Sequence, residues 1–303
     1  MLTKMFKPNH YTQKQKQKIS KELNYVSKEE AIEDFEKLKD IGCNAKNKGL
    51  SRVGTDVVNK FTQVERLNTK SKKGLSFFDL LSNKSKITTP AIIKLLKYYN
   101  VSKKDADVKI WKRVMDLYFG SISVFKPIIA MELYCRYSPN TILDFTMGWG
   151  GRMVGACALN VPNYIGIDNN TNLITPYKHL KNLMDDLSKT NTKLYFEDAV
   201  NFNYNKIEYD MVFTSPPYYN IEIYNNIQKQ SKDDWDQNFY IPLFTKTYKG
   251  LKKGGYYCLN IPVELYERVM LSLLGKYTEK ILLKKIKRFS NSEYHEYIYI
   301  WKK

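Results

Sequence analysis

The chain has 303 residues, of which 43% are hydrophobic and 26% are charged, a composition that excludes a disordered protein and is typical of a globular one. Its 49 Lys and Arg residues against 31 Asp and Glu give a formal net charge of +18, which favours a polyanionic partner, nucleic acid above all. Residues 1–105 carry 23 basic and 11 acidic residues, so two thirds of the excess lies in the first third of the chain.

Cysteine and histidine usage gives no sign of a metal site. The four cysteines, Cys43, Cys135, Cys157 and Cys258, are too far apart for zinc-ligand spacing, so we expect no metal and reduced, buried thiols. We also find no signal-peptide pattern at the N-terminus and no uninterrupted apolar run of membrane-spanning length. These features predict a soluble, intracellular, cytoplasmic protein with no membrane partner.

The first third of the chain indicates short helices. Residues 1–25 are rich in Lys and Gln and predict a mobile arm. A capping-box pattern that begins at Ser27 predicts an amphipathic helix that ends at Gly42. Two further helices are expected, at 90–99 behind a Thr-Pro start and at 109–119.

From about residue 125, short apolar runs rich in β-formers alternate with amphipathic segments. This alternation predicts an α/β fold, a Rossmann-like, doubly wound and mostly parallel sheet. The last strand follows a long basic segment, 276–288, which is consistent with a different direction for that strand. We divide the chain into a basic helical region, 1–105, and an α/β domain, 106–303. The strands are expected at 141–145, 164–168, 193–196, 210–214, 255–261 and 296–301.

A glycine-rich turn follows the first predicted strand. Asp144 is followed by Gly148 and Gly150, so the backbone can pass close to a nucleotide-like ligand at a helix N-terminus. The next strand ends in Asp168, where a carboxylate can accept both ribose hydroxyls. An acidic residue at the start of the turn suits a cationic ligand, and the sulfonium and ammonium groups of S-adenosylmethionine fit that charge. A tight structural turn with Asp168 as a helix cap explains the same residues about equally well.

The third predicted strand is followed by Glu197, Asp198 and Ala199. A carboxylate at this place can accept a hydrogen bond from the adenine amino group of the same ligand. The alternative is an ordinary solvated helix cap, and the assignment depends mostly on the register with the other two strands.

The most informative string is Thr-Ser-Pro-Pro-Tyr-Tyr-Asn at 214–220, directly after the fourth predicted strand. Two prolines stiffen the backbone and hold the Ser215 hydroxyl and the Pro216 carbonyl as fixed acceptors beside an aromatic ring that can stack on a base. Acceptors that bind both N–H groups of an exocyclic amine localise its lone pair and direct it at a sulfonium methyl. Transfer then depends on positioning and electrostatics and needs no metal. An isolated Pro-Pro would more often be a simple strand-terminal turn.

The order of these motifs, D-x-x-x-G-x-G, G-I-D, E-D-A and T-S-P-P-Y-Y-N, resembles that of the S-adenosylmethionine-dependent DNA amino-methyltransferases, which methylate cytosine N4 or adenine N6. The resemblance covers about residues 120–303 and does not include 1–105. It implies a class I methyltransferase fold, S-adenosylmethionine as cofactor, and a DNA base flipped into the site. Ser215 stands where many adenine enzymes have Asp, which favours cytosine N4 over adenine N6.

The resemblance also implies roles for individual residues. Asp144 and the glycines would line the methionine end of the cofactor, Asp168 its ribose and Asp198 its adenine. The bulky Trp149 and the following Gly151-Arg152 depart from the family pattern. The implied catalytic positions are Ser215, Pro216, Pro217 and Tyr218, and the implied contacts to the base are Tyr218, Tyr219 and Asn220. The implied cofactor-binding positions are Lys126, Pro127, Asp144, Phe145, Thr146, Gly148, Gly150, Asp168, Asn169, Asp198 and Ala199.

Target recognition is expected in residues 1–105, because the short stretch between Asp198 and Ser215 leaves no room for a recognition domain. DNA is favoured as the partner, and an RNA base methyltransferase is the alternative in the same class. A catalytically silent methyltransferase fold that binds nucleic acid is the alternative from another class, and the intact motifs disfavour it. Protein amine methylation usually goes with Asn at the position of Ser215. A carbon-5 cytosine enzyme is disfavoured because no cysteine follows a proline.

Overall fold

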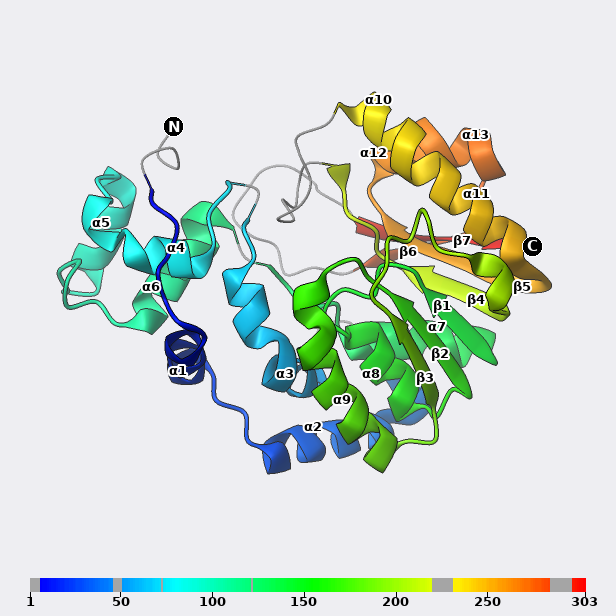
Figure 1. Ribbon diagram of the computed structural model, residues 1–303, viewed down its shortest axis with the longest axis horizontal. Helices are drawn as coiled ribbons and strands as arrows, with labels where there is room; N and C mark the ends of the chain where they lie inside the picture. The colour runs from blue at the N-terminus through cyan, green and yellow to red at the C-terminus, as the bar shows by residue number, and fades with distance from the viewer. Residues whose placement is uncertain (1–5, 46–50, 72, 121, 220–230, 284–295) are drawn as a thin grey trace. The chain divides into compact units, whose positions relative to one another are not determined.

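The computed structural model describes residues 6–45, 51–71, 73–120, 122–219, 231–283 and 296–303 (Figure 1). The chain divides into two compact units. Unit 1 comprises residues 1–27, 62–123 and 220–229, and unit 2 comprises residues 28–61, 124–219 and 230–303.

Unit 1 is a helical assembly with its own apolar core. Phe77, Phe78 and Trp111 are at most 1% exposed in that core, and each buried aromatic side chain stabilises the fold by about 1.5–3 kcal/mol. The helices expected at 90–99 and 109–119 are confirmed. Unit 1 contains α1 (Gln13–Leu23), the residues of α3 (Thr55–Asn68) from 62 onwards, α4 (Phe77–Ser82), α5 (Pro90–Tyr98), and α6 (Val108–Val114) with the π-helical turn Met115–Phe119.

The Lys- and Gln-rich segment expected to be a mobile arm contains a helix, α1, so this prediction is wrong for residues 13–23. Thr12 and Gln15 form a reciprocal capping box that satisfies backbone N–H groups at the helix start. At the other end, Gln63 Nε2 donates to the Ser20 carbonyl at 2.8 Å. A capping box and one buried hydrogen bond thus order a segment whose composition alone predicts disorder.

The division into units does not coincide with the boundary expected at residue 105. Residues 28–61, which carry seven basic and seven acidic residues, belong to unit 2, and residues 106–123 belong to unit 1. Unit 1 therefore carries 20 Lys and Arg against 7 Asp and Glu, a net +13 of the +18 of the whole chain. The segregation of positive charge seen in the sequence is kept, and the neutral segment 28–61 is separated from it.

Unit 2 is built on a seven-stranded sheet of order β3-β2-β1-β4-β5-β7-β6. β1 pairs in parallel with β2 and β4, and among the described strands β7 alone runs in the opposite direction, antiparallel to both β5 and β6. The predicted Rossmann-like, mostly parallel sheet is confirmed, as is the different direction of the last strand. The strands are β1 (Thr141–Asp144), β2 (Asn163–Ile167), β3 (Asn191–Tyr195), β4 (Tyr209–Thr214), β5 (Leu251–Ile261), β6 (Glu279–Leu283) and β7 (Glu296–Lys302).

β6 lies within the basic segment 276–288, where no strand was predicted. Its residues alternate between half-buried and exposed, because it forms the edge of the sheet and pairs only with β7. β6 begins with the charged residues Glu279 and Lys280. It therefore lacks the continuous apolar run by which the central strands are recognised in the sequence.

Helices cover both faces of the sheet, with α8 and α9 on one side and α11 on the other (Figure 1). A large apolar core combines residues of α2, α7, α8 and α9 with the sheet. The helix expected after Ser27 is confirmed as α2, which ends before Gly42 at a φ of +48°. The helices of unit 2 are α2 (Lys28–Ile41), α7 (Pro127–Tyr137), α8 (Gly151–Ala158), α9 (Ile174–Leu187), α10 (Lys232–Trp235), α11 (Ile241–Gly250), α12 (Val263–Leu265) and α13 (Leu271–Leu274).

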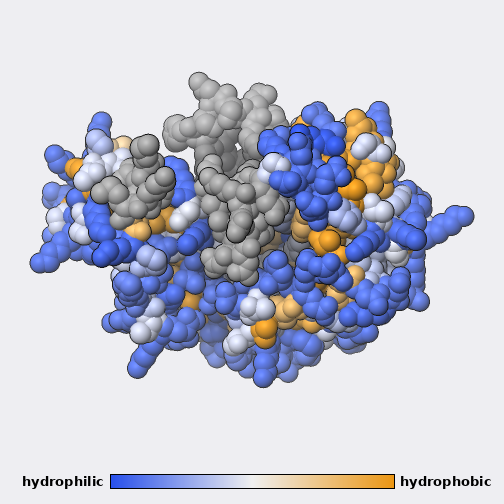
Figure 2. Space-filling model, turned by 45° about the horizontal axis from the view of Figure 1, so that its top comes forward, coloured by the Kyte–Doolittle hydropathy of each residue, from blue (hydrophilic) through white to orange (hydrophobic). Residues whose placement is uncertain are grey.

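No described helix is both long enough and apolar enough to cross a bilayer. On the face shown in Figure 2 most visible side chains are hydrophilic. Among the large apolar side chains that are exposed, Val263 and Leu271 lie on α12 and α13, at 38% and 46% exposure.

A disulfide joins Cys43 to Cys135 in unit 2, so the prediction that all cysteines are reduced is wrong for this pair. Cys43 lies in the 3-10 turn after α2 (Gly42–Ala45) and Cys135 lies in α7, with Cα atoms 5.4 Å apart. The two residues are 92 positions apart, so only the packing of α2 and α7 brings them together. Cys157 and Cys258 are buried free thiols, as predicted, and burial raises the pKa of Cys157 to about 12.

Replacing Cys135 with Ser is expected to lower the free energy of unfolding by up to about 4 kcal/mol, because the disulfide closes a long loop in the unfolded chain. Denaturant unfolding of both proteins without reductant measures the difference. Reductant should remove most of it. A difference that reductant leaves unchanged would show that the two thiols are not joined in solution.

Candidate active site

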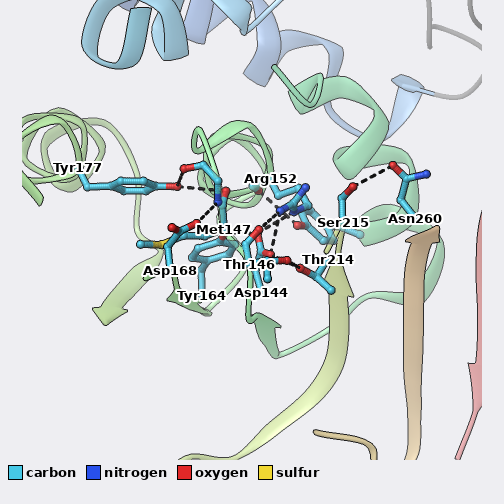
Figure 3. Close-up of polar contacts among 12 residues, drawn as sticks. Asp144, Thr146, Met147, Arg152, Tyr164, Asp168, Tyr177, Thr214, Ser215 and Asn260 are labelled. Carbon is cyan, nitrogen blue, oxygen red and sulfur yellow. Dashed lines mark hydrogen bonds and ion pairs between the residues drawn. The ribbon is translucent and has the colours of Figure 1, made fainter. Parts of the chain in front are cut away.

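The predicted ligand-binding motifs meet at the carboxyl ends of the parallel strands. β1 ends at Asp144, β2 is followed by Asp168 and β4 by Ser215 (Figure 3). β1 is flanked by β2 on one side and β4 on the other, so the strand order reverses between β1 and β4. Open α/β sheets form their ligand crevice at such a point, because the adjacent connections leave in opposite directions.

The turn between β1 and α8 contains two glycines in backbone conformations that favour glycine, with φ of +56° at Gly148 and +93° at Gly150. A Cβ at Gly150 would lie 2.9 Å from the Leu180 side chain, so this glycine also allows α8 and α9 to pack closely. A Cβ at Gly148 would meet only the Thr146 carbonyl, at 3.9 Å, among the described atoms within 4 Å. Gly148 therefore leaves space in which a ligand can approach the backbone.

Asp168 ties the end of β2 to this turn. One carboxylate oxygen accepts from the Gly148 N–H at 2.9 Å and the other accepts from the Asn170 N–H at 2.9 Å. Burial raises the pKa of Asp168 to about 6, although these two N–H groups favour the charged form. The Tyr177 hydroxyl on α9 donates to the Gly148 carbonyl at 3.1 Å and holds the turn from the other side. The carboxylate of Asp168 is thus half-buried, has a raised pKa and accepts hydrogen bonds at the turn.

The segment before α7 lies against the start of α8. A Cβ at Gly151 would come within 1.8 Å of the Phe125 carbonyl oxygen, and one at Gly155 within 2.7 Å of the Pro127 carbonyl oxygen. Glycine at these two positions is therefore what allows the close approach. The predicted pair Lys126 and Pro127 lies beside the turn, and burial, together with the charge of Arg52, lowers the pKa of Lys126.

Asp144, predicted to line the methionine end of the cofactor, lies inside the protein among hydrogen-bonding side chains. It is fully buried, and Arg152 donates to its two oxygens at 2.7 and 3.0 Å from Nε and Nη2. The hydroxyls of Thr214 and Tyr164 donate to the same oxygens at 2.8 and 2.6 Å. Burial by itself would lower the pKa of Arg152, but the Asp144 carboxylate outweighs it and holds that pKa above its usual range. Arg152 reaches back from the first turn of α8, which the sequence did not reveal.

The ion pair also connects the turn to the loop after β4 (Figure 3). Arg152 Nη2 donates to the Thr146 carbonyl at 2.5 Å, and the hydroxyls of Thr146 and Thr214 lie 2.5 Å apart. Thr214 directly precedes Ser215. The ends of β1 and β4 are therefore held together by one buried cluster.

Replacing Arg152 with Met should lower the free energy of unfolding by about 3–5 kcal/mol, because Asp144 is left buried without its positive partner. Asp144→Asn in the same chain should recover part of that loss, since a neutral amide costs less to bury than a carboxylate. Urea unfolding of the wild type, both single variants and the double variant measures the coupling. Additive losses would contradict the pairing.

The loop after β4 places Ser215 in a polar cluster with Tyr218, Asn260 and Glu296. Ser215 Oγ lies 2.8 Å from the Tyr218 hydroxyl and 3.3 Å from Asn260 Oδ1. The Tyr218 hydroxyl lies 2.8 Å from the Asn260 carbonyl oxygen and 3.3 Å from Glu296 Oε1. Asn260 and Glu296 were not identified from the sequence, because their positions depend on how β5 pairs with β4 and β7.

Tyr219, predicted to contact a base, is instead a buried anchor of the loop with 4% exposure. Its hydroxyl donates to Asp236 at 2.9 Å and its N–H donates to the Tyr240 hydroxyl at 2.9 Å. Tyr240 in turn donates to the Pro217 carbonyl at 2.6 Å, which fixes the second proline. Asn220, also predicted to contact the base, lies outside the described residues.

Two predicted cofactor residues are enclosed in the protein. Phe145 is fully buried and packs on Phe244, with ring centroids 6.1 Å apart. Ala199 is buried, and its carbonyl accepts from the Tyr204 hydroxyl at 2.8 Å. The Phe145 ring therefore stabilises its loop by packing, and Ala199 stabilises its loop through a backbone hydrogen bond.

Two others lie at the surface of the same sheet edge. Asn169 and Asp198 are exposed. Asp198 accepts from the Val200 N–H at 2.9 Å and from Asn201 Nδ2 at 2.7 Å within a turn, and it caps no described helix, because the next helical element, Tyr204–Lys206, is capped by Asn203. Its contact with an adenine ring stays a prediction. Within the described ranges, no three His, Cys, Asp or Glu side chains gather where they could hold a metal ion.

Comparison with known proteins assigns no family. No protein-family model and no curated protein matches the chain. Among solved structures, an rRNA methylase from Streptococcus thermophilus matches 60% of this chain and 99% of its own, at 13% identity and a TM-score of 0.39. A tRNA methyltransferase from Aquifex aeolicus matches 60% and 70%, at 13% identity and a TM-score of 0.39. A precorrin decarboxylase from Methanobacterium thermoautotrophicum matches 59% and 92%, at 17% identity and a TM-score of 0.41. At these TM-scores the likenesses carry no argument about function.

Proposed function

We propose that the protein is an S-adenosylmethionine-dependent methyltransferase that methylates an exocyclic amino group of a DNA base, cytosine N4 before adenine N6. The observation that carries this proposal is the position of the Ser-Pro-Pro-Tyr loop, 215–218, next to the glycine turn at one edge of the sheet. The two are tied together through Asp144, Arg152 and Thr214. Direct transfer requires the methyl donor and the amine to be held in contact and aligned, which adjacent binding elements achieve.

The residues around the turn fit the proposed cofactor. Gly148 leaves space beside the backbone, and the half-buried carboxylate of Asp168 hydrogen-bonds to the same turn. Asp168 would accept the ribose hydroxyls, and Asp198, exposed after the neighbouring strand, would accept from the adenine amino group. When bound, S-adenosylmethionine supplies an electrophilic methyl group on a sulfonium centre.

Ser215 and Pro216 would bind the amine. The Ser215 hydroxyl is oriented by Tyr218 and Asn260, so it is fixed before a substrate arrives. With the Pro216 carbonyl as the second acceptor, both N–H groups of the amine are engaged and the lone pair on nitrogen is free to attack. Tyr218 is half-buried, with its hydroxyl in the polar cluster, and its ring would stack on the base.

Nucleic acid is the proposed partner because unit 1 carries a net charge of +13. Lysines and arginines that contact phosphates give an affinity that falls steeply with salt. The same exocyclic amines occur in RNA, so RNA enters the experiment as a separate substrate.

The affinity for S-adenosylmethionine is expected to fall as the pH falls through about 6, the raised pKa of Asp168. Above that pH the carboxylate accepts ribose hydroxyls, and below it the protonated carboxyl is a poorer acceptor, so binding is lost on the acid side. Asp168→Asn should weaken binding by about 2 kcal/mol, roughly thirtyfold, and remove the pH dependence between 5 and 7. Titration calorimetry measures both. As a control, Glu208→Gln removes an exposed carboxylate paired with Lys252 and should keep wild-type affinity.

The proposed function is tested by incubating the protein with methyl-labelled S-adenosylmethionine and, separately, duplex DNA, single-stranded DNA and RNA. Mass spectrometry of the nucleosides should detect N4-methylated cytosine or N6-methylated adenine in DNA. Ser215→Ala should slow transfer by about a hundredfold and leave cofactor affinity unchanged, because Ser215 contacts the amine. Label in RNA alone would reassign the substrate. Bound cofactor with no labelled nucleoside in any sample would contradict the proposal.

A further inference from the structure

A buried carboxylate lies directly behind the Ser-Pro-Pro-Tyr loop. Glu296, the first residue of β7, is 7% exposed, and its Oε1 accepts from the Tyr218 hydroxyl at 3.3 Å. The same hydroxyl lies 2.8 Å from Ser215 Oγ. A continuous line of oxygen atoms thus runs from Ser215 through Tyr218 to Glu296, entirely within unit 2. A carboxylate is costly to bury, so its position beside the Tyr218 hydroxyl calls for a role.

Asn260 contacts both hydroxyl groups of this line, and Figure 3 shows its contact with Ser215. Its Nδ2 donates to the Tyr297 carbonyl at 3.0 Å, and its Oδ1 lies 3.3 Å from Ser215 Oγ and 3.1 Å from the Tyr218 hydroxyl, which also lies 2.8 Å from the Asn260 carbonyl oxygen. Each of the two hydroxyls can donate one proton and also accept one. A proton delivered to Ser215 can therefore be passed on to Tyr218 and released toward Glu296.

The proposed reaction generates a proton that must leave the amine. The nitrogen lone pair forms the bond to the methyl carbon, and the carbon–sulfur bond breaks with its electron pair on sulfur. The nitrogen then carries a positive charge until it loses one hydrogen. A positioned acceptor removes this proton without opening the site to water.

We propose that Glu296 is the final acceptor of this proton, with Ser215 and Tyr218 as the relay. Ser215 takes the proton from the amine and gives its own to Tyr218, which gives its own to Glu296. The sulfonium cation, neutral amine and carboxylate become a neutral thioether, a neutral methylated amine and a neutral carboxylic acid, so atoms and charge balance. Glu296 acts through Tyr218 and is a positioning residue of the site. This inference rests on the proposed function.

Glu296→Gln tests the relay, because glutamine keeps the shape and can accept from Tyr218 but cannot take up a proton. We expect the turnover number to fall by about a hundredfold, with the KM for DNA and the affinity for S-adenosylmethionine unchanged. Glu296→Asp should recover part of the loss. Tyr218→Phe should have a similar effect on turnover, and the double variant should lose little more, because both changes interrupt one path.

A second readout needs no cofactor. Infrared difference spectra between the wild type and Glu296→Gln identify the carboxyl band of Glu296. That band should shift in Tyr218→Phe and, through Tyr218, also in Ser215→Ala. An unchanged band in Ser215→Ala would show that Ser215 is not coupled to Glu296 and would overturn the relay.

Glu279→Gln is the matched control, since Glu279 on β6 is a half-buried carboxylate that accepts from the Tyr137 hydroxyl at 3.0 Å. It should keep wild-type turnover. If Glu296→Gln fails to fold, the turnover of Glu296→Asp and of Tyr218→Phe tests the same path. Wild-type turnover in Glu296→Gln would overturn the relay alone, whereas no transfer by the wild type to any nucleic acid would overturn the proposed function and the relay together.

Discussion

The buried ion pair between Asp144 and Arg152 is the interaction on which the candidate active site depends. Two charges removed from water cost several kcal/mol each unless they are paired and fully hydrogen-bonded. Here each carboxylate oxygen has two donors, and one of them is the hydroxyl of Thr214. The end of β1 and the start of α8 cannot separate without leaving an uncompensated charge inside the protein, and the Thr214 hydroxyl ties the end of β4 to the same carboxylate. The two loops of the proposed chemistry begin at these strand ends, so their spacing is set before any ligand binds.

The polar cluster around Asn260 has a different physical character. It contains hydroxyls and a carboxylate that can exchange protons. It joins β4, β5 and β7, whereas the ion pair joins β1 and α8. Its geometry depends on the sheet order, because β7 enters between β5 and β6 and brings Glu296 to the edge where β4 ends. A rigid ion pair and a cluster with mobile protons thus flank the same loop. The first fixes where the loop starts, and the second determines what its hydroxyl groups can do.

The two units of the chain also differ in charge. Unit 2 holds the sheet and the candidate site, and it includes the neutral segment 28–61, which packs through α2 and the disulfide from Cys43 to Cys135. Unit 1 carries most of the positive charge and has an apolar core of its own. The charge of unit 1 supports the proposed nucleic-acid partner, and the candidate site belongs to unit 2.

Features that depend on a few neighbouring residues could be predicted from the sequence alone. These local signals are the strand and helix periods, the glycines at 148 and 150, and the prolines after Ser215. They determined the sheet class and the order of the motifs. Only the tertiary structure decided that Asp144 is buried, that Tyr219 is an anchor, and that Glu296 stands behind Tyr218. Tyr218 and Glu296 are 78 positions apart, and Thr214 and Asp144 are 70 apart. Arg152 is only eight residues from Asp144, yet a sequence does not show which charges are removed from water. Strand pairing and burial decide those contacts, because both depend on the whole chain.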